Sequence, residues 1–127
     1  MKILLLLAMI FLHIVDDYYL QGWLASAKQK SWWEQNAQDE LYKHDYIMAL
    51  FMHSFSWAFM IMIVPTIYAL TIATNIPLII ALFVGNLYMH MIVDDMKANR
   101  KKINLIQDQL MHLAQIIVTW IFLVAIA

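Results

Sequence analysis

The chain has 127 residues, of which 64% are hydrophobic and only 13% are charged, and its mean hydropathy is +0.68. A water-soluble protein of this size cannot bury so much apolar surface, so the composition excludes a soluble fold. The net charge of −1 provides no basic surface for nucleic acid, and the lack of cysteine excludes disulfides and thiolate metal sites.

Long stretches without charge predict the architecture. No Asp, Glu, Lys or Arg occurs in residues 3–15, 46–93 or 109–127. The middle stretch would measure about 72 Å as one helix, whereas the hydrocarbon core of a bilayer is about 30 Å thick. It is therefore expected to cross the membrane twice. We predict a single integral-membrane domain over residues 1–127, an all-α bundle of four transmembrane helices.

The first span is expected at about residues 3–22. Lys2 before an apolar run, with Ala25-Ser26-Ala27 after it, also resembles a signal peptide and its cleavage site. The distance from the run to that site is too long and contains His13, Asp16 and Asp17, which favours a span. Span two is expected at about 46–68, span three at about 76–99 and span four at about 104–127, with a turn within 66–77.

The polar connection between the first two spans is expected to form a short interfacial helix. Ser31 and Glu34 have the spacing of a capping box, and apolar residues recur at helical spacing behind them. We predict an amphipathic helix at about residues 31–43 that lies on the membrane surface, with Trp32 and Trp33 at the level of the headgroups. Asn104 with Gln107 is expected to cap the start of the last span.

The basic residues predict the orientation. Most of them lie in the connections after the first and third spans, which share one side of the membrane. They are Lys28, Lys30 and Lys43 in the first connection and Lys97, Arg100, Lys101 and Lys102 in the second. Because basic residues concentrate on the cytoplasmic side, both termini are expected on the opposite, periplasmic side.

Polar residues inside the spans form a repeated pattern. Three spans each contain one His and one Asp four residues apart, a spacing that places both on one helical face. The order is His then Asp in the first and third spans and is reversed in the fourth, which runs in the opposite direction. The second span adds one His. The seven residues are His13, Asp17, His53, His90, Asp94, Asp108 and His112.

These residues are expected at matching depths. The four histidines lie about 12–14 Å below the cytoplasmic face, and the aspartates lie about one turn shallower. Each buried Asp costs about 3 kcal/mol, and no Lys or Arg is expected at that depth. A divalent cation would neutralise the carboxylates and use both residue types as ligands. We predict one or two Zn, Mn or Fe ions per chain; the alternative is a metal-free network in which protonated histidines offset the carboxylates.

Two further acids lie beside these motifs. Asp16 precedes Asp17, and Asp95 follows Asp94. Either could be the general base of a metal-dependent reaction. The alternative is that they reach the headgroups or pair with Lys97 and Arg100.

Residues 13–25, HIVDDYYLQGWLA, resemble the opening signature of the small bacterial and phage membrane proteins grouped as domain of unknown function 3307. That signature is His-x-x-x-Asp, an aromatic residue, then Leu-Gln and a Trp. Later elements of the family are matched by His53, by His90 with Asp94, and by Asp108-Gln109 followed by His112. The chain departs from the family pattern in its doubled acids and in its long 26–45 connection. The resemblance implies a bacterial cytoplasmic membrane, and it implies no activity.

Three functions compete at this point. The first is a metal-dependent hydrolase of a membrane-associated substrate. The second is transport of a divalent cation or protons, which the almost entirely apolar opposite half of the chain disfavours. The third is a metal-stapled structural module that binds another membrane protein, or a second copy, through the 31–43 helix. In every case the lipid bilayer is an expected partner, and nucleic acid is not.

Overall fold

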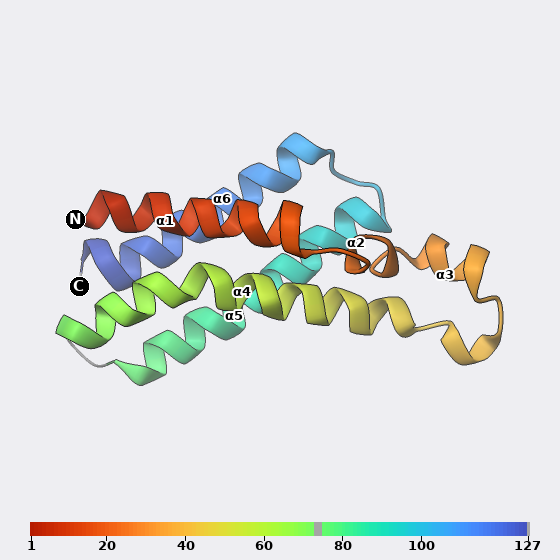
Figure 1. The fold of residues 1–127 in the computed structure, drawn as a ribbon, viewed down its shortest axis with the longest axis horizontal. Coiled ribbons are helices and arrows are strands. Elements are labelled where there is room, and N and C mark those ends of the chain that lie inside the picture. Colours follow the sequence, from red (N-terminus) through yellow and green to blue (C-terminus); the bar gives the residue numbers. More distant parts are fainter. Residues whose placement is uncertain (73–74, 127) are drawn as a thin grey trace.

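The structure is a computed structural model that describes residues 1–72 and 75–126, and these residues form helices and connecting turns without any strand. Four helical segments are long and apolar enough to cross a membrane, as predicted: Lys2–Leu20, Glu40–Ile72, Ile76–Ala98 and Leu105–Ala125. They run side by side along the long axis of the molecule, and both termini lie at one end of the bundle (Figure 1). The fold prediction is confirmed.

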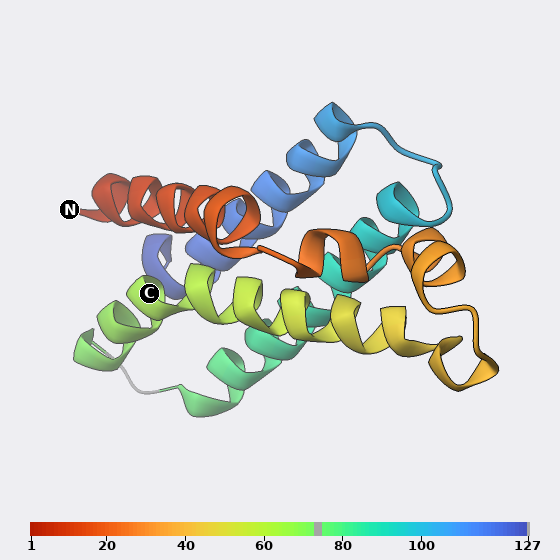
Figure 2. The same cartoon turned by 45° about the vertical axis from the view of Figure 1, so that its right-hand side comes forward.

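The long segments are built from the following elements. Helix α1 (Lys2–Ile14) continues into the π-helix η1 (Val15–Leu20), and α6 (Leu105–Trp120) continues into the π-helix η3 (Ile121–Ala125). Between them lie α4 (Asp45–Ile72) and α5 (Ile76–Ala98). Figure 2 shows that the start of α6 lies well away from the end of α1, so these two helices diverge toward the end of the bundle that is opposite the termini.

The ends of the helices follow local side-chain chemistry. The predicted cap at the start of α6 is confirmed: Asn104 Oδ1 accepts from Gln107 N at 2.9 Å, and Gln107 Oε1 accepts from Asn104 N at 3.0 Å. The predicted end of the second span at residue 68 is wrong, because α4 continues to Ile72 beyond Pro65. Membrane helices tolerate an internal Pro when their surroundings satisfy the freed backbone groups. Residues 73–74 of the predicted turn lie outside the described residues.

The connection between the first two spans is broken into short pieces, so the prediction of one helix over 31–43 is wrong. The pieces are α2 (Leu24–Ala27), α3 (Lys30–Asn36) and the 3-10 turn η2 (Glu40–Tyr42). Ser31 lies inside α3 and does not cap it. The break follows Asn36, and Asp39 Oδ1 then accepts from Leu41 N at 2.9 Å to start a new turn. Such side-chain bonds to the backbone compete with helix continuation.

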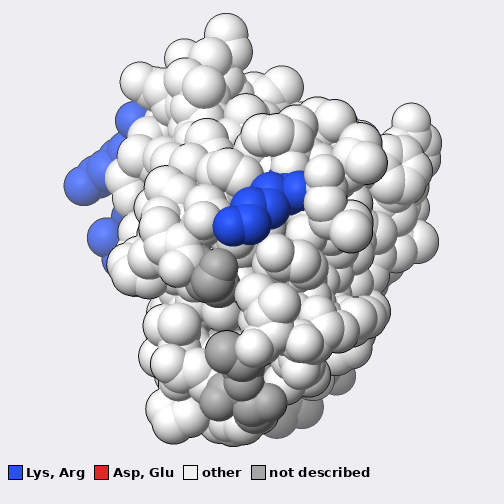
Figure 3. Space-filling model, turned by 90° about the vertical axis from the view of Figure 1, so that its left-hand side faces the viewer, with Lys and Arg blue, Asp and Glu red and all other residues white. Residues whose placement is uncertain are grey.

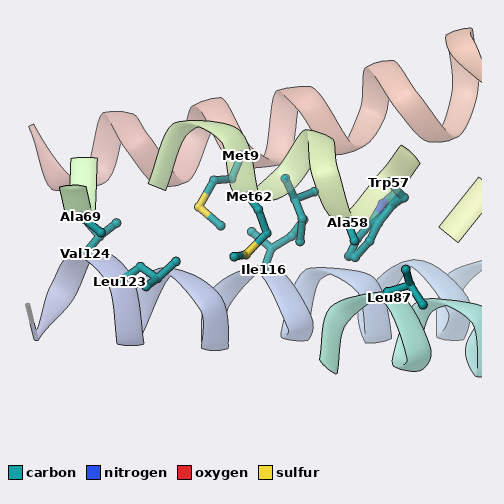
Figure 4. Close-up of a cluster of buried hydrophobic side chains, with 10 residues drawn as sticks. Met9, Trp57, Ala58, Met62, Ala69, Leu87, Ile116, Leu123 and Val124 are labelled. Carbon is teal, nitrogen blue, oxygen red and sulfur yellow. The ribbon is translucent and has the colours of Figure 1, made fainter. Parts of the chain in front are cut away.

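The interior of the bundle is apolar toward the termini. Its buried side chains include Met9, Ile61, Met62, Leu123 and Val124, which come from α1, α4 and the last span (Figure 4). Charge is sparse on the face at this end, where the view shows a few basic atoms and no acidic ones (Figure 3). The polar half of the interior therefore lies toward α2 and α3, at the opposite end of the bundle.

Candidate metal centre

The polar residues predicted from the sequence lie together in the interior. Three groups of three residues each offer ligand atoms that all lie within 4.8 Å of one another, and they could hold a metal ion. Every member of these groups is buried. Together the groups contain six of the seven predicted ligands, namely Asp17, His53, His90, Asp94, Asp108 and His112. Residues from all four long helical segments therefore converge on one place.

One nitrogen of His53 and three atoms near it form what we call the first ligand set: His53 Nε2, His90 Nε2, Asp17 Oδ1 and Asp94 Oδ2. His53 Nε2 lies 3.1 Å from His90 Nε2, 3.2 Å from Asp17 Oδ1 and 3.3 Å from Asp94 Oδ2. His90 Nε2 lies 3.7 Å from the same Asp94 oxygen. A tetrahedral ion with bonds of about 2.0–2.1 Å holds its ligand atoms about 3.3 Å apart. The three distances from His53 Nε2, and the one between His90 and Asp94, are therefore close to those of a tetrahedral divalent-cation site.

One nitrogen of His112 and two carboxylate oxygens near it form the second ligand set: His112 Nε2, Asp94 Oδ1 and Asp108 Oδ1. His112 Nε2 lies 3.4 Å from Asp94 Oδ1 and 3.3 Å from Asp108 Oδ1. Within the described residues, none of these three buried atoms has a hydrogen-bond partner. An unpartnered buried polar atom costs about 1–3 kcal/mol, so two carboxylate oxygens that each lie beside the same unpartnered histidine nitrogen favour a shared ligand. The two oxygens of Asp94 belong to different sets, so this carboxylate is placed to bridge them.

The expectation that no Lys reaches this depth is wrong. Lys28 Nζ donates to Asp94 Oδ2 at 2.7 Å, and both side chains are buried. Lys97 Nζ donates to Asp108 Oδ2 at 3.0 Å. Long lysine stems can carry an ammonium group several ångströms from the backbone, a reach that helical depth alone does not predict. Four buried carboxylates thus face two ammonium groups, which leaves two negative charges if the histidines are neutral; the four are Asp16, Asp17, Asp94 and Asp108.

His13 is the one predicted ligand that belongs to neither set. Its Nδ1 accepts from Trp57 Nε1 at 2.8 Å, because an indole nitrogen can only donate. Its Nε2 lies 2.9 Å from Gln109 Oε1 and therefore carries the proton. The amide of Gln109 is oriented by its Nε2, which donates to Asp17 Oδ2 and to Asp108 Oδ2, each at 3.0 Å. Both ring nitrogens of His13 are thus engaged in holding the network together.

We therefore expect His13→Gln to keep its full metal content at saturating metal concentration, whereas His112→Gln loses the ion of the second set. The His13 variant should be less stable by about 1–3 kcal/mol, because Trp57 Nε1 loses its acceptor. Elemental mass spectrometry of both purified variants checks this. Equal metal loss in the two variants would show that His13 is a ligand after all.

The two acids considered as general bases have different surroundings. Asp16 is buried, its Oδ1 accepts from Ser56 Oγ at 2.5 Å, and its Oδ2 lies 3.9 Å from His53 Nδ1. It therefore lies behind a ligand of the first set. Asp95 instead accepts from Arg100 Nε at 2.9 Å and from Asn99 Nδ2 at 2.8 Å. The structure does not bring Asp95 to either ligand set.

The π-helix η1 allows consecutive acids to face inward. Asp16 and Asp17 are 1% and 8% exposed, although neighbouring residues of a regular α-helix point about 100° apart. A π-turn changes this angle, and π-turns are frequent at functional sites. Sequence reasoning missed η1, and it also missed the roles of Trp57 and Gln109. Their positions in the sequence could have indicated that they lie near the site, since Trp57 lies one turn after His53 and Gln109 adjoins Asp108.

The fold and the site together define a helical bundle, compatible with a multi-pass membrane protein, that encloses a buried His/Asp cluster able to hold metal. The chain belongs to the family described as protein of unknown function (DUF3307), which matches residues 4–127. The resemblance noted for residues 13–25 is thereby confirmed. No curated protein and no solved structure matches the chain.

Proposed function

We propose that this protein is a metal-dependent hydrolase of the bacterial cytoplasmic membrane, in which the two ligand sets hold two divalent cations near the cytoplasmic face. One observation carries the proposal. The second ligand set consists of three buried atoms without hydrogen-bond partners among the described residues, and it shares Asp94 with the first set. Imidazole and carboxylate ligands suit Zn, Mn and Fe, and a cation would offset the surplus negative charge.

The numbers of ligands favour catalysis over a structural role. Structural metal sites are usually closed by four protein ligands, whereas catalytic sites keep one position open. The first set offers four atoms and the second offers three. Asp17 also lies near the second set, but its Oδ1 belongs to the first set and its Oδ2 accepts from Gln109. Cations held there would supply Lewis-acid polarisation and activate water at neutral pH.

The surrounding residues have supporting tasks in this proposal. Asp94 holds the two sets at a fixed separation. Asp16 Oδ2 lies 3.9 Å behind His53 Nδ1, so its negative charge favours the ring orientation that presents Nε2 to the first set, and Gln109 holds Asp17 and Asp108 in place. We therefore assign Asp16 a positioning role in place of the general-base role considered from the sequence.

The apolar half of the bundle supports a site that opens on one side only. Beyond the histidines, Asn86 Nδ2 donates to Thr119 Oγ1 at 2.7 Å, and Gln115 Nε2 donates to the Asn86 carbonyl at 3.1 Å. Past this layer the described interior is filled by apolar side chains such as Met9, Ile61 and Leu123. An ion would meet few ligands there, so this half favours a hydrolase over a transporter.

Metal content and turnover test the proposal together. Elemental mass spectrometry of detergent-purified protein should find about two Zn, Mn or Fe ions per chain, as expected for a two-metal site. Manganese-loaded protein should show the magnetic coupling of a bridged pair by electron paramagnetic resonance. Hydrolysis of long-chain alkyl phosphates and p-nitrophenyl esters in mixed micelles should stop on chelation. Well-folded protein that binds no metal after reloading would contradict the proposal and favour the proton-sharing network.

A further inference from the structure

We infer that the substrate is a phosphate-bearing lipid, whose chain enters an apolar cleft between α1 and α6 and whose phosphate occupies an adjoining pocket lined by lysines. The inference rests on the proposed function, because it identifies the substrate class of the same site. Two cavities near the ligand sets support it, and neither is lined by a residue of those sets.

The first cavity, which we call the α1–α6 cleft, has a volume of about 550 Å³. Ile10, Ile14 and Leu113 give it apolar walls, and His13 and Gln109 bring the polar network to it. It lies where α1 and α6 diverge (Figure 2). An apolar opening between two predicted membrane spans faces lipid, so the bilayer itself can supply a hydrocarbon chain to it.

The second cavity, which we call the lysine pocket, has a volume of about 520 Å³. Three of its lining residues are Lys28, Lys97 and Lys101, and Gln21 and Gln29 add amide groups. Lys97 lies in the last turn of α5, and the other four lie in the connections between spans, where lipid headgroups are expected. Several ammonium groups beside amide donors match a phosphate group.

One buried carboxylate oxygen, which lines neither cavity, accepts hydrogen bonds from a lining residue of each. Asp108 Oδ2 accepts from Lys97 Nζ and from Gln109 Nε2, each at 3.0 Å. Lys97 lines the lysine pocket and Gln109 lines the α1–α6 cleft. The other oxygen, Asp108 Oδ1, belongs to the second ligand set. A lipid that spans both cavities therefore passes between residues that contact Asp108, a member of the second ligand set.

The balance of charges favours a dianionic headgroup. Lys28 and Lys97 now pair with Asp94 and Asp108, and both carboxylates belong to the ligand sets. Two divalent cations would turn the surplus of two negative charges into two positive ones, and the cation of the first set would compete with Lys28 for Asp94 Oδ2. A phosphate monoester dianion restores neutrality. Binding of metal and of lipid phosphate should therefore strengthen each other, because such coupling is reciprocal.

The reaction that follows is hydrolysis of a phosphate monoester. Water attacks phosphorus, and the bond between phosphorus and the lipid oxygen breaks. One proton of the water ends on the lipid oxygen, which leaves as the alcohol. The other stays on inorganic phosphate.

Binding of dodecyl phosphate to metal-loaded protein in neutral detergent, measured by calorimetry, tests the inference, and dodecylphosphonate, which cannot be hydrolysed, separates the heat of binding from that of turnover. Dodecyl phosphate should bind at least about tenfold more tightly than dodecanol or inorganic phosphate, and removing the metal should weaken its binding at least about fivefold. Lys101→Gln should weaken binding about tenfold, because one charge-assisted contact is lost. Lys101 is exposed, so this variant should fold. Lys102→Gln, next to it and outside the pocket lining, is the matched control.

The outcomes separate this inference from the proposed function. Equal binding of dodecyl phosphate and dodecanol, or equal effects of the two lysine variants, overturns the lipid phosphate site even if the metal content is as expected. Inorganic phosphate that binds as tightly as dodecyl phosphate overturns the role of the cleft. Protein without metal contradicts the proposed function itself, independently of the binding assay.

Discussion

Asp94→Asn is expected to abolish binding of both metal ions. Asp94 Oδ2 belongs to the first ligand set and Oδ1 belongs to the second, where each lies 3.3–3.4 Å from a histidine nitrogen. Asparagine has one oxygen and no negative charge, so it cannot serve both sets. The metal content after dialysis against buffered metal, measured by elemental mass spectrometry, should therefore fall from about two ions per chain to nearly none.

The control for Asp94→Asn separates loss of metal from the destabilising effect of leaving the Lys28 ammonium group without its ion-pair partner. Removing one member of a buried ion pair leaves the other charge unpaired, at a cost of about 3–5 kcal/mol. The double variant Asp94→Asn with Lys28→Met removes both charges and should recover most of the lost stability without recovering metal. His53→Ala and His112→Ala each affect one set and should each lose about one ion. An Asp94→Asn protein that keeps one tightly bound ion would show that the carboxylate does not bridge.

The course of the four long segments could be predicted because the bilayer limits both their length and their charge. The stretch 46–93 contains no charged residue and is too long for one crossing, so two spans and a turn were the remaining solution. The connection was harder to predict. Its break after Asn36 depends on local competition, where Asp39 holds the backbone of the next turn, and no hydrophobic pattern encodes that contact.

Six of the predicted ligands could be recognised because spacing and depth restrict helical side chains strongly. An i,i+4 pair must share a face, and antiparallel spans with reversed motifs must place them at one level. The roles of His13 and Lys28 could not be predicted in this way. His13 depends on Trp57 from another helix, and Lys28, which directly follows α2, reaches Asp94 because α2 packs against α4. Both are tertiary contacts between side chains that are distant in the sequence.

Trp57→Ala is expected to cause the largest loss of stability. Trp57 is fully buried, its ring stacks on His90 with centroids 4.1 Å apart and planes 17° apart, and its Nε1 donates to His13. Truncating a buried Trp costs about 3–5 kcal/mol. His90 also loses the ring that fixes its orientation, which should weaken metal binding about 10- to 100-fold. Unfolding by SDS, followed by circular dichroism, measures the first effect, and metal titration measures the second.

Two milder variants separate the contributions of Trp57. Trp57→Phe keeps an aromatic ring against His90 but leaves His13 Nδ1 without its donor, so it should lose about 1–3 kcal/mol and keep its metal affinity. Trp120→Phe is the matched control, because Trp120 Nε1 donates to the Lys2 carbonyl at an exposed position, where water can replace the bond. The tautomer assigned to His13 requires that Trp57→Phe destabilise the protein more than Trp120→Phe does. Equal destabilisation by the two substitutions would mean that the indole does not hold His13, and His13 would then be free to join the ligands.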